Sequence, residues 1–298
     1  MKKRTAFTMI ELIFVIVIMG IIGKFGVEFL AQAYESFIFS KINNELQSNS
    51  ETAVETIASR LQYRIKDSVI ARTTKISAPV AIADATGSNY KVLEWVGVDE
   101  DGFRGISDDN TSAYLPNWSG IIDLDAGDKN RLISPQTNTA KVDAMISDLS
   151  STNHGVDDAA LYFIGANTNI QTGYGWNGAL TNQQGAMHPI KKTANANEFT
   201  SSNGVDFSGI DIYEYYQLAW TAYAIVYEPG TNHKGTLRLY YDYQPWNGGK
   251  LSDGKSAILM ENVSTFQFMS IGSIMKIQVC TTSDLVEEYS LCKEKTIF

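Results

Sequence analysis

Residues 7–23 read FTMIELIFVIVIMGIIG, and this apolar run determines the first half of the fold. No polar side chain interrupts it over residues 12–23, and its apolar character extends to about Ala33. An α-helix rises about 1.5 Å per residue, so a helix of this length can cross a hydrocarbon core about 30 Å thick. The sequence therefore predicts a transmembrane helix over residues 7–30.

Three cations, Lys2, Lys3 and Arg4, precede the apolar run. Positive charges beside a membrane span favour its cytoplasmic end, so the rest of the chain is expected on the other side. No second apolar run of this length occurs in the sequence. The expected topology is one span followed by a large exported part.

Two simpler interpretations of the run leave features unexplained. A secretory signal peptide needs a cleavage site of small residues after its apolar core. Here Lys24, Phe25 and Glu28 follow the run instead. A plain signal anchor explains the length but not Glu11, because a carboxylate inside an apolar span is costly and usually functional.

The segment combines a basic leader, a small residue, the start Phe-Thr-Met-Ile-Glu and an unbroken aliphatic run. This combination resembles the cleavage and methylation signal of type IV prepilins and type II secretion pseudopilins. The resemblance implies that residues 1–6 are a leader, that a prepilin peptidase cuts between Ala6 and Phe7, and that Phe7 is then N-methylated. Glu11, the fifth residue after that cut, matches the family's acid, which pairs with the new amine of a neighbouring subunit during assembly.

Two departures from the family pattern concern single residues. Ala6 stands where the family usually has Gly before the cut, so a small residue is kept. Glu28 stands where major pilins usually carry a Pro that kinks the helix. The second departure suits a minor subunit better than a major one.

Three later segments resemble the J/W type of large minor pilins. They are residues 223–227 (YAIVY), 235–239 (GTLRL) and 259–268 (LMENVSTFQF). The pair Arg60-Leu61 in the expected helix also suits that type. The family's shape, a long spine helix whose outer half lies against a β-sheet, is the fold that this resemblance implies.

Beyond the span, apolar residues recur at mostly four-residue spacing among charged and polar ones. They are Ile38, Ile42, Leu46, Ala53, Ile57, Leu61, Ile65 and Val69. This stripe predicts that the helix continues as an exported amphipathic half over residues 31–74, ending at about Arg72 before Pro79. Bends are expected at the glycines of residues 20–26 and at the polar residues 47–50.

After Pro79 the apolar runs become short and rich in β-branched and aromatic residues, which predicts a β-rich domain over residues 75–298. Strands are expected at residues 91–98, 121–124, 159–164, 217–227, 236–243, 256–260, 265–270 and 273–279, with a short helix at 141–149. The polar residues 167–203 are interpreted as a long surface excursion of the sheet domain. Helix first and strands afterwards is an α+β order, with the spine helix packed on an antiparallel sheet.

Cys280 and Cys292 are the two cysteines of the chain. An exported location is oxidising, which favours a disulfide between them over a metal site. A C-terminal disulfide loop is also a recurrent feature of pilins. The bridge is expected to pin the last strand and the tail.

Several other patterns are interpreted as carrying no chemistry. The formal charge of −9 opposes broad binding to nucleic acid. Residues 173–178 spell G-x-G-x-x-G, but no helix is expected after them, so a flexible loop is favoured over a cofactor site. The acidic groups at residues 99–101 and 123–128 lack EF-hand spacing, so solvated turns are favoured over calcium sites. The histidines are isolated, and the chain is expected not to be an enzyme.

These observations predict a minor type IV pilin or pseudopilin that takes part in filament assembly, in a priming or tip complex. The implied partners are other minor pilins or pseudopilins, the prepilin peptidase, the inner-membrane assembly platform and the lipid bilayer. The protein is expected in the inner membrane with its C-terminal domain in the periplasm, and in a pilus or pseudopilus after assembly. The alternative is a filament-tip binding module, an adhesin or DNA-uptake subunit, whose residues 167–203 contact a ligand.

Overall fold

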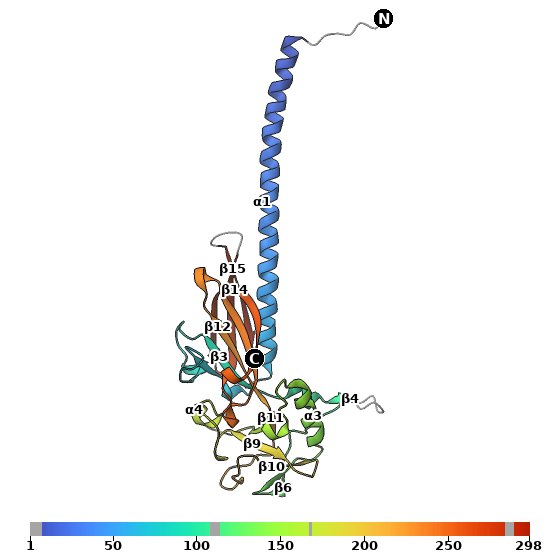
Figure 1. Ribbon diagram of the computed structural model, residues 1–298, viewed down its shortest axis with the longest axis vertical. Coiled ribbons are helices and arrows are strands. Elements are labelled where there is room, and N and C mark those ends of the chain that lie inside the picture. Colours follow the sequence, from blue (N-terminus) through green and yellow to red (C-terminus); the bar gives the residue numbers. More distant parts are fainter. Residues whose placement is uncertain (1–7, 108–113, 167–168, 284–288) are drawn as a thin grey trace.

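The structure is a computed structural model that describes residues 8–107, 114–166, 169–283 and 289–298 (Figure 1). One long helix, α1 (Met9–Gln62), runs out of a β-rich region, and the first half of the helix projects from it alone (Figure 1). The other described residues form two larger antiparallel sheets and one small two-stranded sheet. The predicted α+β class and the long N-terminal helix are confirmed.

Helix α1 is continuous over 54 residues, so it is about 80 Å long at about 1.5 Å per residue. It ends at Gln62, and the prediction that it continues to about Arg72 is wrong. Beyond that end the Ile65 N–H donates to Val96 O (2.9 Å), and the Val98 N–H donates to Tyr63 O (2.8 Å). The apolar spacing continues past the helix because Ile65 is buried against a sheet rather than along a helix face.

An eight-stranded sheet carries the C-terminal end of the chain. Its order is β16-β15-β14-β13-β12-β3-β1-β2, and every neighbouring pair is antiparallel. The strands are β1 (Ile70–Arg72), β2 (Val80–Ala81), β3 (Val92–Gly97), β12 (Thr221–Glu228), β13 (Gly235–Tyr243), β14 (Lys255–Ile271), β15 (Ile274–Thr282) and β16 (Ser290–Ile297). The long β14 joins the two strands expected at 256–260 and 265–270. Asn262, at φ 58°, lies between them, where the pairing with β13 shifts register, so β14 bends there without ending.

A six-stranded sheet lies at the opposite end of the molecule from the projecting half of α1 (Figure 1). Its order is β11-β8-β9-β10-β7-β6, and β4 and β5 form the two-stranded sheet. The strands are β4 (Ile106–Ser107), β5 (Tyr114–Leu115), β6 (Asp123–Asp128), β7 (Arg131–Ile133), β8 (Ala160–Phe163), β9 (Met187–Lys192), β10 (Glu198–Ser201) and β11 (Tyr216–Ala219). The strand expected at 217–227 is therefore two strands in different sheets, β11 and β12, separated at Trp220.

Residues 167–203 are not the surface excursion that the sequence predicts. Their described part supplies two strands of the six-stranded sheet, and Met187, Ile190 and Phe199 are fully buried. The glycine-rich residues 173–178 are likewise anchored, because Tyr174 and Trp176 are buried there. Polar composition hid these strands, since a few large apolar side chains are enough to hold the segment in a core.

The remaining helices are short. They are α2 (Glu100–Arg104), α3 (Thr139–Leu149), α4 (Ile170–Gly173) and the 3-10 turns Lys66–Ser68, Ile82–Asp84, Val156–Asp158, Thr231–His233, Pro245–Asn247 and Leu251–Asp253. The helix expected at 141–149 is confirmed as α3. It starts at Thr139 because the Asn138 side chain accepts from the Lys141 N–H (3.1 Å) and caps it.

Candidate assembly surface

The projecting half of α1 exposes large apolar side chains along its whole length. These are Met9, Ile10, Leu12, Ile13, Phe14, Val15, Ile16, Val17, Ile18, Met19, Ile21, Ile22, Phe25, Val27, Phe29, Leu30, Tyr34, Phe37 and Phe39. Consecutive residues of a helix point about 100° apart, so this run is apolar on every side. Of the helices that the structure describes, α1 is the one that is long and apolar enough to cross a membrane by length and composition.

Glu11 lies in the first turn of α1, and its carboxylate contacts its own chain. The oxygen Oε2 accepts from the Thr8 N–H and from the Thr8 Oγ1–H, both at 3.3 Å. This is the acid half of a capping box, and the helix dipole favours a negative charge at this end. Ala6 and Phe7, the predicted cleavage and methylation residues, lie outside the described residues, so the predicted pairing of Glu11 with an amine stays a prediction.

The second half of α1 packs against β3, β14, β15 and β16. Its buried residues are Ile42, Leu46, Ser50, Ala53, Val54, Ile57, Ala58 and Leu61. The predicted stripe therefore faces the sheet. At the rim, Lys293 and Lys295 of the edge strand β16 pair with Glu51 (3.5 Å) and Glu55 (2.5 Å) of α1.

The end of α1 is held by two arginines. Arg60 donates to Tyr223 Oη (3.2 Å), and its guanidinium lies 5.3 Å from the centre of that ring. Arg64 is buried and donates to Leu61 O (2.7 Å) and to Ser273 O (2.6 Å). Arg64 thereby ties the last carbonyls of the helix to the turn between β14 and β15, in a position where a cation also suits the helix dipole.

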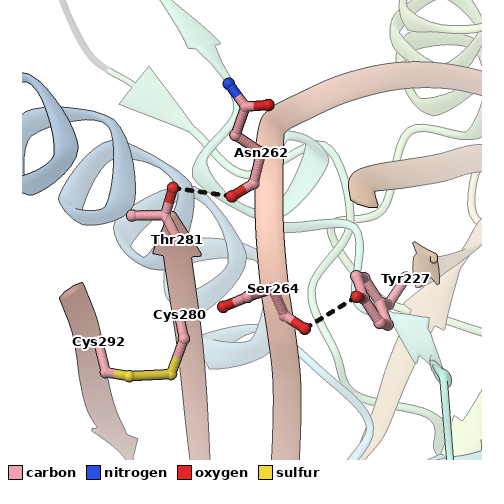
Figure 2. The surroundings of a disulfide bond; sticks show 6 residues. All are labelled: Tyr227, Asn262, Ser264, Cys280, Thr281 and Cys292. Atoms are coloured by element: carbon pink, nitrogen blue, oxygen red, sulfur yellow. Dashed lines mark hydrogen bonds between the residues drawn. A yellow bond between two sulfur atoms is a disulfide. The ribbon is translucent and has the colours of Figure 1, made fainter. Parts of the chain in front are cut away.

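A disulfide joins Cys280 of β15 to Cys292 of β16, as predicted (Figure 2). The two residues are directly opposite each other in the ladder, with their Cα atoms 4.0 Å apart. Beside the bridge, two residues at the bend in β14 accept hydrogen bonds: Thr281 Oγ1 donates to Asn262 O (3.0 Å), and Tyr227 Oη donates to Ser264 O (2.9 Å) (Figure 2). The bridge therefore sits in a well-connected part of the sheet.

The hairpin of β15 and β16 reaches α1 where the helix leaves the sheet. Tyr289 Oη donates to Asn43 Oδ1 (3.2 Å), and the Tyr289 ring lies edge-on to the Phe39 ring with 6.3 Å between centroids. The disulfide-bridged hairpin consequently supports the helix at the boundary between its packed and projecting halves. The position of this support could not be read from the sequence, because 246 residues separate Asn43 from Tyr289.

Sequence reasoning missed a buried acid close to the end of α1. Asp99 is buried, not a solvated turn residue, and it accepts from Trp118 Nε1 (3.0 Å) and the Gly102 N–H (3.2 Å). Burial raises the pKa of the Asp99 carboxyl to about 6. No local pattern signalled this burial, because the Trp118 indole that donates to Asp99 lies nineteen residues away in the chain.

In the second predicted acidic turn, the carboxylates accept hydrogen bonds from backbone N–H groups of the same turn. Asp123 Oδ1 accepts from the Asp125 and Ala126 N–H groups, and Asp128 Oδ1 accepts from the Asn130 and Arg131 N–H groups. Across the described residues, no group of three His, Cys, Asp or Glu side chains is placed to hold a metal ion.

No family model, curated protein or solved structure matches this chain.

Proposed function

We propose that this protein is a minor subunit of a type IV pilus or a type II secretion pseudopilus, and that it acts in filament assembly within a priming or tip complex. One observation carries the proposal: a continuous helix has one half packed on a sheet and one half apolar on every side, with Glu11 in its first turn.

The apolar half of α1 must be covered on all sides, which one partner helix cannot do. A helix that is apolar on one stripe is covered by one neighbour, whereas a helix that is apolar all round needs lipid or several other helices. A bilayer supplies the first surrounding, and a bundle of equivalent helices in a filament core supplies the second. Transfer between the two explains why the projecting half carries no packed domain of its own.

Glu11 favours the transfer of the helix from the bilayer to the filament. Among the described residues, its carboxylate accepts hydrogen bonds of 3.3 Å from Thr8 alone. The resemblance supplies a stronger partner, the methylated amine of Phe7 in a neighbouring subunit. Two charges that are each costly in lipid compensate one another when the subunits meet, so assembly is favoured over dispersal in the membrane.

A priming or tip position follows from the size of the exported part. Two larger sheets and their connections occupy residues 63–298 in the described ranges, and this bulk lies around the end of a single helix (Figure 1). Such a body is difficult to repeat at every step of a closely packed filament. At the end of a filament it meets no such restriction.

The test separates the charge of Glu11 from its capping role. Glu11→Gln keeps the capping box, in which Gln can replace Glu, but removes the charge; Glu11→Leu removes both. Glu28→Gln is the matched control, because Glu28 is an exposed acid of the same helix half and lies 3.9 Å from Lys24. Each full-length variant is crosslinked in membranes, and co-purifying minor subunits are quantified.

We expect both Glu11 variants to lose their partners and Glu28→Gln to keep them. Wild-type recovery of partners with Glu11→Gln, together with loss in Glu11→Leu, would show that Glu11 is only a helix cap. A deletion strain scored in parallel for surface pili and for secreted enzymes distinguishes the two filament systems.

A further inference from the structure

An open hollow of about 610 Å³ lies between α4 and the segment that follows it, up to Gly185. Five side-chain amides line it: Asn169, Gln171, Asn177, Asn182 and Gln184. The described lining residues include no ionisable side chain, and Ala179 and Leu180 are their only apolar ones. The hollow therefore offers many hydrogen-bonding groups, no charged side chain and few apolar side chains.

The backbone around this hollow is anchored by contacts with the rest of the molecule. Trp176, between the lining residues Gly175 and Asn177, is buried and donates through Nε1 to Ser68 O (3.2 Å). Gly175 has φ +83°, and a Cβ there would come within 2.3 Å of Pro245 O, so the backbone is pressed against the 3-10 turn Pro245–Asn247. The Ala186 N–H donates to Gly173 O (2.8 Å) and closes the segment. A rigid site loses little conformational entropy when it binds a ligand.

Three of the five amides use one polar atom in a hydrogen bond within the chain, and their other polar atom can bind a ligand. Asn169 and Asn182 accept through Oδ1 from the N–H groups of Gln171 (2.8 Å) and Gln184 (3.0 Å), and Asn177 donates through Nδ2 to Gln171 O (3.0 Å). Among the described residues, the other polar atom of each of these three amides makes no hydrogen bond within the chain. The same holds for the whole amide groups of Gln171 and Gln184, and all five side chains are exposed.

A second, smaller hollow adjoins the first and shares Gln184 and Gly185 with it. Tyr213 lines this second hollow and is 37% exposed. Its ring lies 6.5 Å from that of Phe163, with the two ring planes tilted by 46°. An aromatic face beside a row of amides offers both stacking against C–H groups and hydrogen bonds to hydroxyl groups.

We propose that these two adjoining hollows bind a neutral saccharide. Every hydroxyl of a sugar both donates and accepts, as a side-chain amide does, and the C–H face of a pyranose ring fits the exposed ring of Tyr213. A phosphate-bearing ligand would need cations, and the described lining of neither hollow includes Lys or Arg. A peptide would need apolar pockets for its side chains, whereas the aliphatic residues are Ala179 and Leu180 in the first hollow and Ala166 and Ile210 in the second, and side-chain amides outnumber them.

The location of the hollows suits a ligand outside the cell envelope. Helix α4 lies in the β-rich end of the molecule, away from the projecting half of α1 (Figure 1). The hollows stay accessible whether a bilayer or a bundle of helices covers the apolar half of α1. The inference does not depend on filament assembly, so saccharide binding by the purified chain and partner recovery in membranes fail independently.

The experiment uses the full chain in a zwitterionic detergent that contains no sugar, because glucoside and maltoside detergents would compete. The probes are an array of neutral hexose and N-acetylhexosamine oligosaccharides, their sialylated and sulfated counterparts, and uncharged peptides. Gln171→Ala and Gln184→Ala are the test variants, since neither side chain hydrogen-bonds the described chain. Gln267→Ala, an exposed amide on β14, is the matched control.

We expect at least one neutral oligosaccharide to bind, its charged counterparts to bind less, and affinity to fall about tenfold or more in each test variant. The control variant keeps wild-type affinity, and all variants keep the wild-type melting temperature. Absence of binding to every neutral oligosaccharide overturns the inference. So does equal binding by the test variants, a preference for sialylated or sulfated glycans, or selective binding of the peptides.

Discussion

At the scale of single residues, burial shifts the pKa values of two side chains in opposite directions. Burial raises the pKa of Asp99 from its usual 3.8 to about 6 and lowers the pKa of His188 from 6.5 to about 4. His188 is packed against the Phe163 ring, with 4.9 Å between ring centroids, and its Nδ1 lies 3.3 Å from Gln183 Oε1. Neither residue was recognised as buried from the sequence.

The two pKa shifts change the free energy of unfolding in opposite directions as pH rises. Between pH 4 and 6, folded Asp99 holds a proton that the unfolded chain has lost, so this residue makes stability fall as pH rises. In the same range the unfolded chain protonates His188 while the folded chain does not, so this residue makes stability rise with pH. Each effect is on the order of 3 kcal/mol over its full range.

We therefore expect the two single variants to diverge with pH. In Asp99→Asn, the free energy of unfolding should rise more steeply than in the wild type between pH 4 and 6. In His188→Gln, it should rise less steeply or fall. Denaturant unfolding of the full chain in detergent at several pH values measures both slopes, and the difference between the variants cancels the titration of all other groups. Parallel slopes in the two variants would show that the two groups are not buried as described.

At the scale of elements, α1 has two halves with different surroundings. Ile57 is completely buried between α1 and the eight-stranded sheet, whereas Ile21 in the projecting half is 52% exposed. Both are isoleucines of one continuous helix, so intrinsic helix propensity affects them alike. Only the tertiary contact differs between them.

Ile57→Ala should lower the free energy of unfolding of the β-rich region by about 2–5 kcal/mol, because it removes buried methyl groups and leaves a cavity. The matched variant Ile21→Ala should change it by less than about 0.5 kcal/mol. Denaturant unfolding in detergent, followed by tryptophan fluorescence, measures both. Equal effects of the two substitutions would contradict the packing of the second half of α1 on the sheet.

The β15–β16 hairpin provides a second prediction at this scale. Cys280→Ser and Cys292→Ser should each cost roughly 3 kcal/mol, and the double variant should cost about the same, because one bridge is lost in every case. In the wild-type protein, both thiols should react with an alkylating reagent only after reduction. Additive costs, or thiols that react without reduction in freshly isolated protein, would show that the bridge does not form in the cell.

At the scale of the whole molecule, the apolar half of α1 should decide where the protein is found. We expect the protein to stay with membranes after washing at alkaline pH, because its projecting half is apolar on every side. Protease added to spheroplasts should degrade the β-rich region. Protection of that region in intact spheroplasts would place it in the cytoplasm and reverse the predicted orientation.

Processing is the second prediction for the whole molecule. Mass spectrometry of protein from a strain with an active prepilin peptidase should show an N-terminus at Phe7 that carries one methyl group. Ala6→Arg should leave the leader attached, because a bulky cation replaces the small residue before the cut, whereas Ala6→Gly should be processed. A wild-type chain that still begins at Met1 in that strain would remove the basis for the family resemblance.

Much of this architecture depends on local sequence. An unbroken apolar run predicts a membrane-length helix without knowledge of anything else in the chain, and the four-residue stripe correctly indicates the face of α1 that meets the sheet. Strands β3, β8, β13 and β15 are marked by short apolar runs between turn residues. The disulfide follows from composition, because the chain contains only two cysteines.

The other features depend on contacts between residues that are far apart in the chain. Alternating residues predict a strand but not its neighbours, so the division of residues 217–227 between two sheets was decided by pairing with β8 on one side and β3 on the other. Likewise, α1 ends at Gln62 because pairing with β3 satisfies the backbone that follows. Burial also depends on what packs above a residue. The sequence by itself therefore determined the membrane-length helix, its packed face and the bridge, whereas only the tertiary structure decided the buried Asp99 and His188 and the amide-lined hollow.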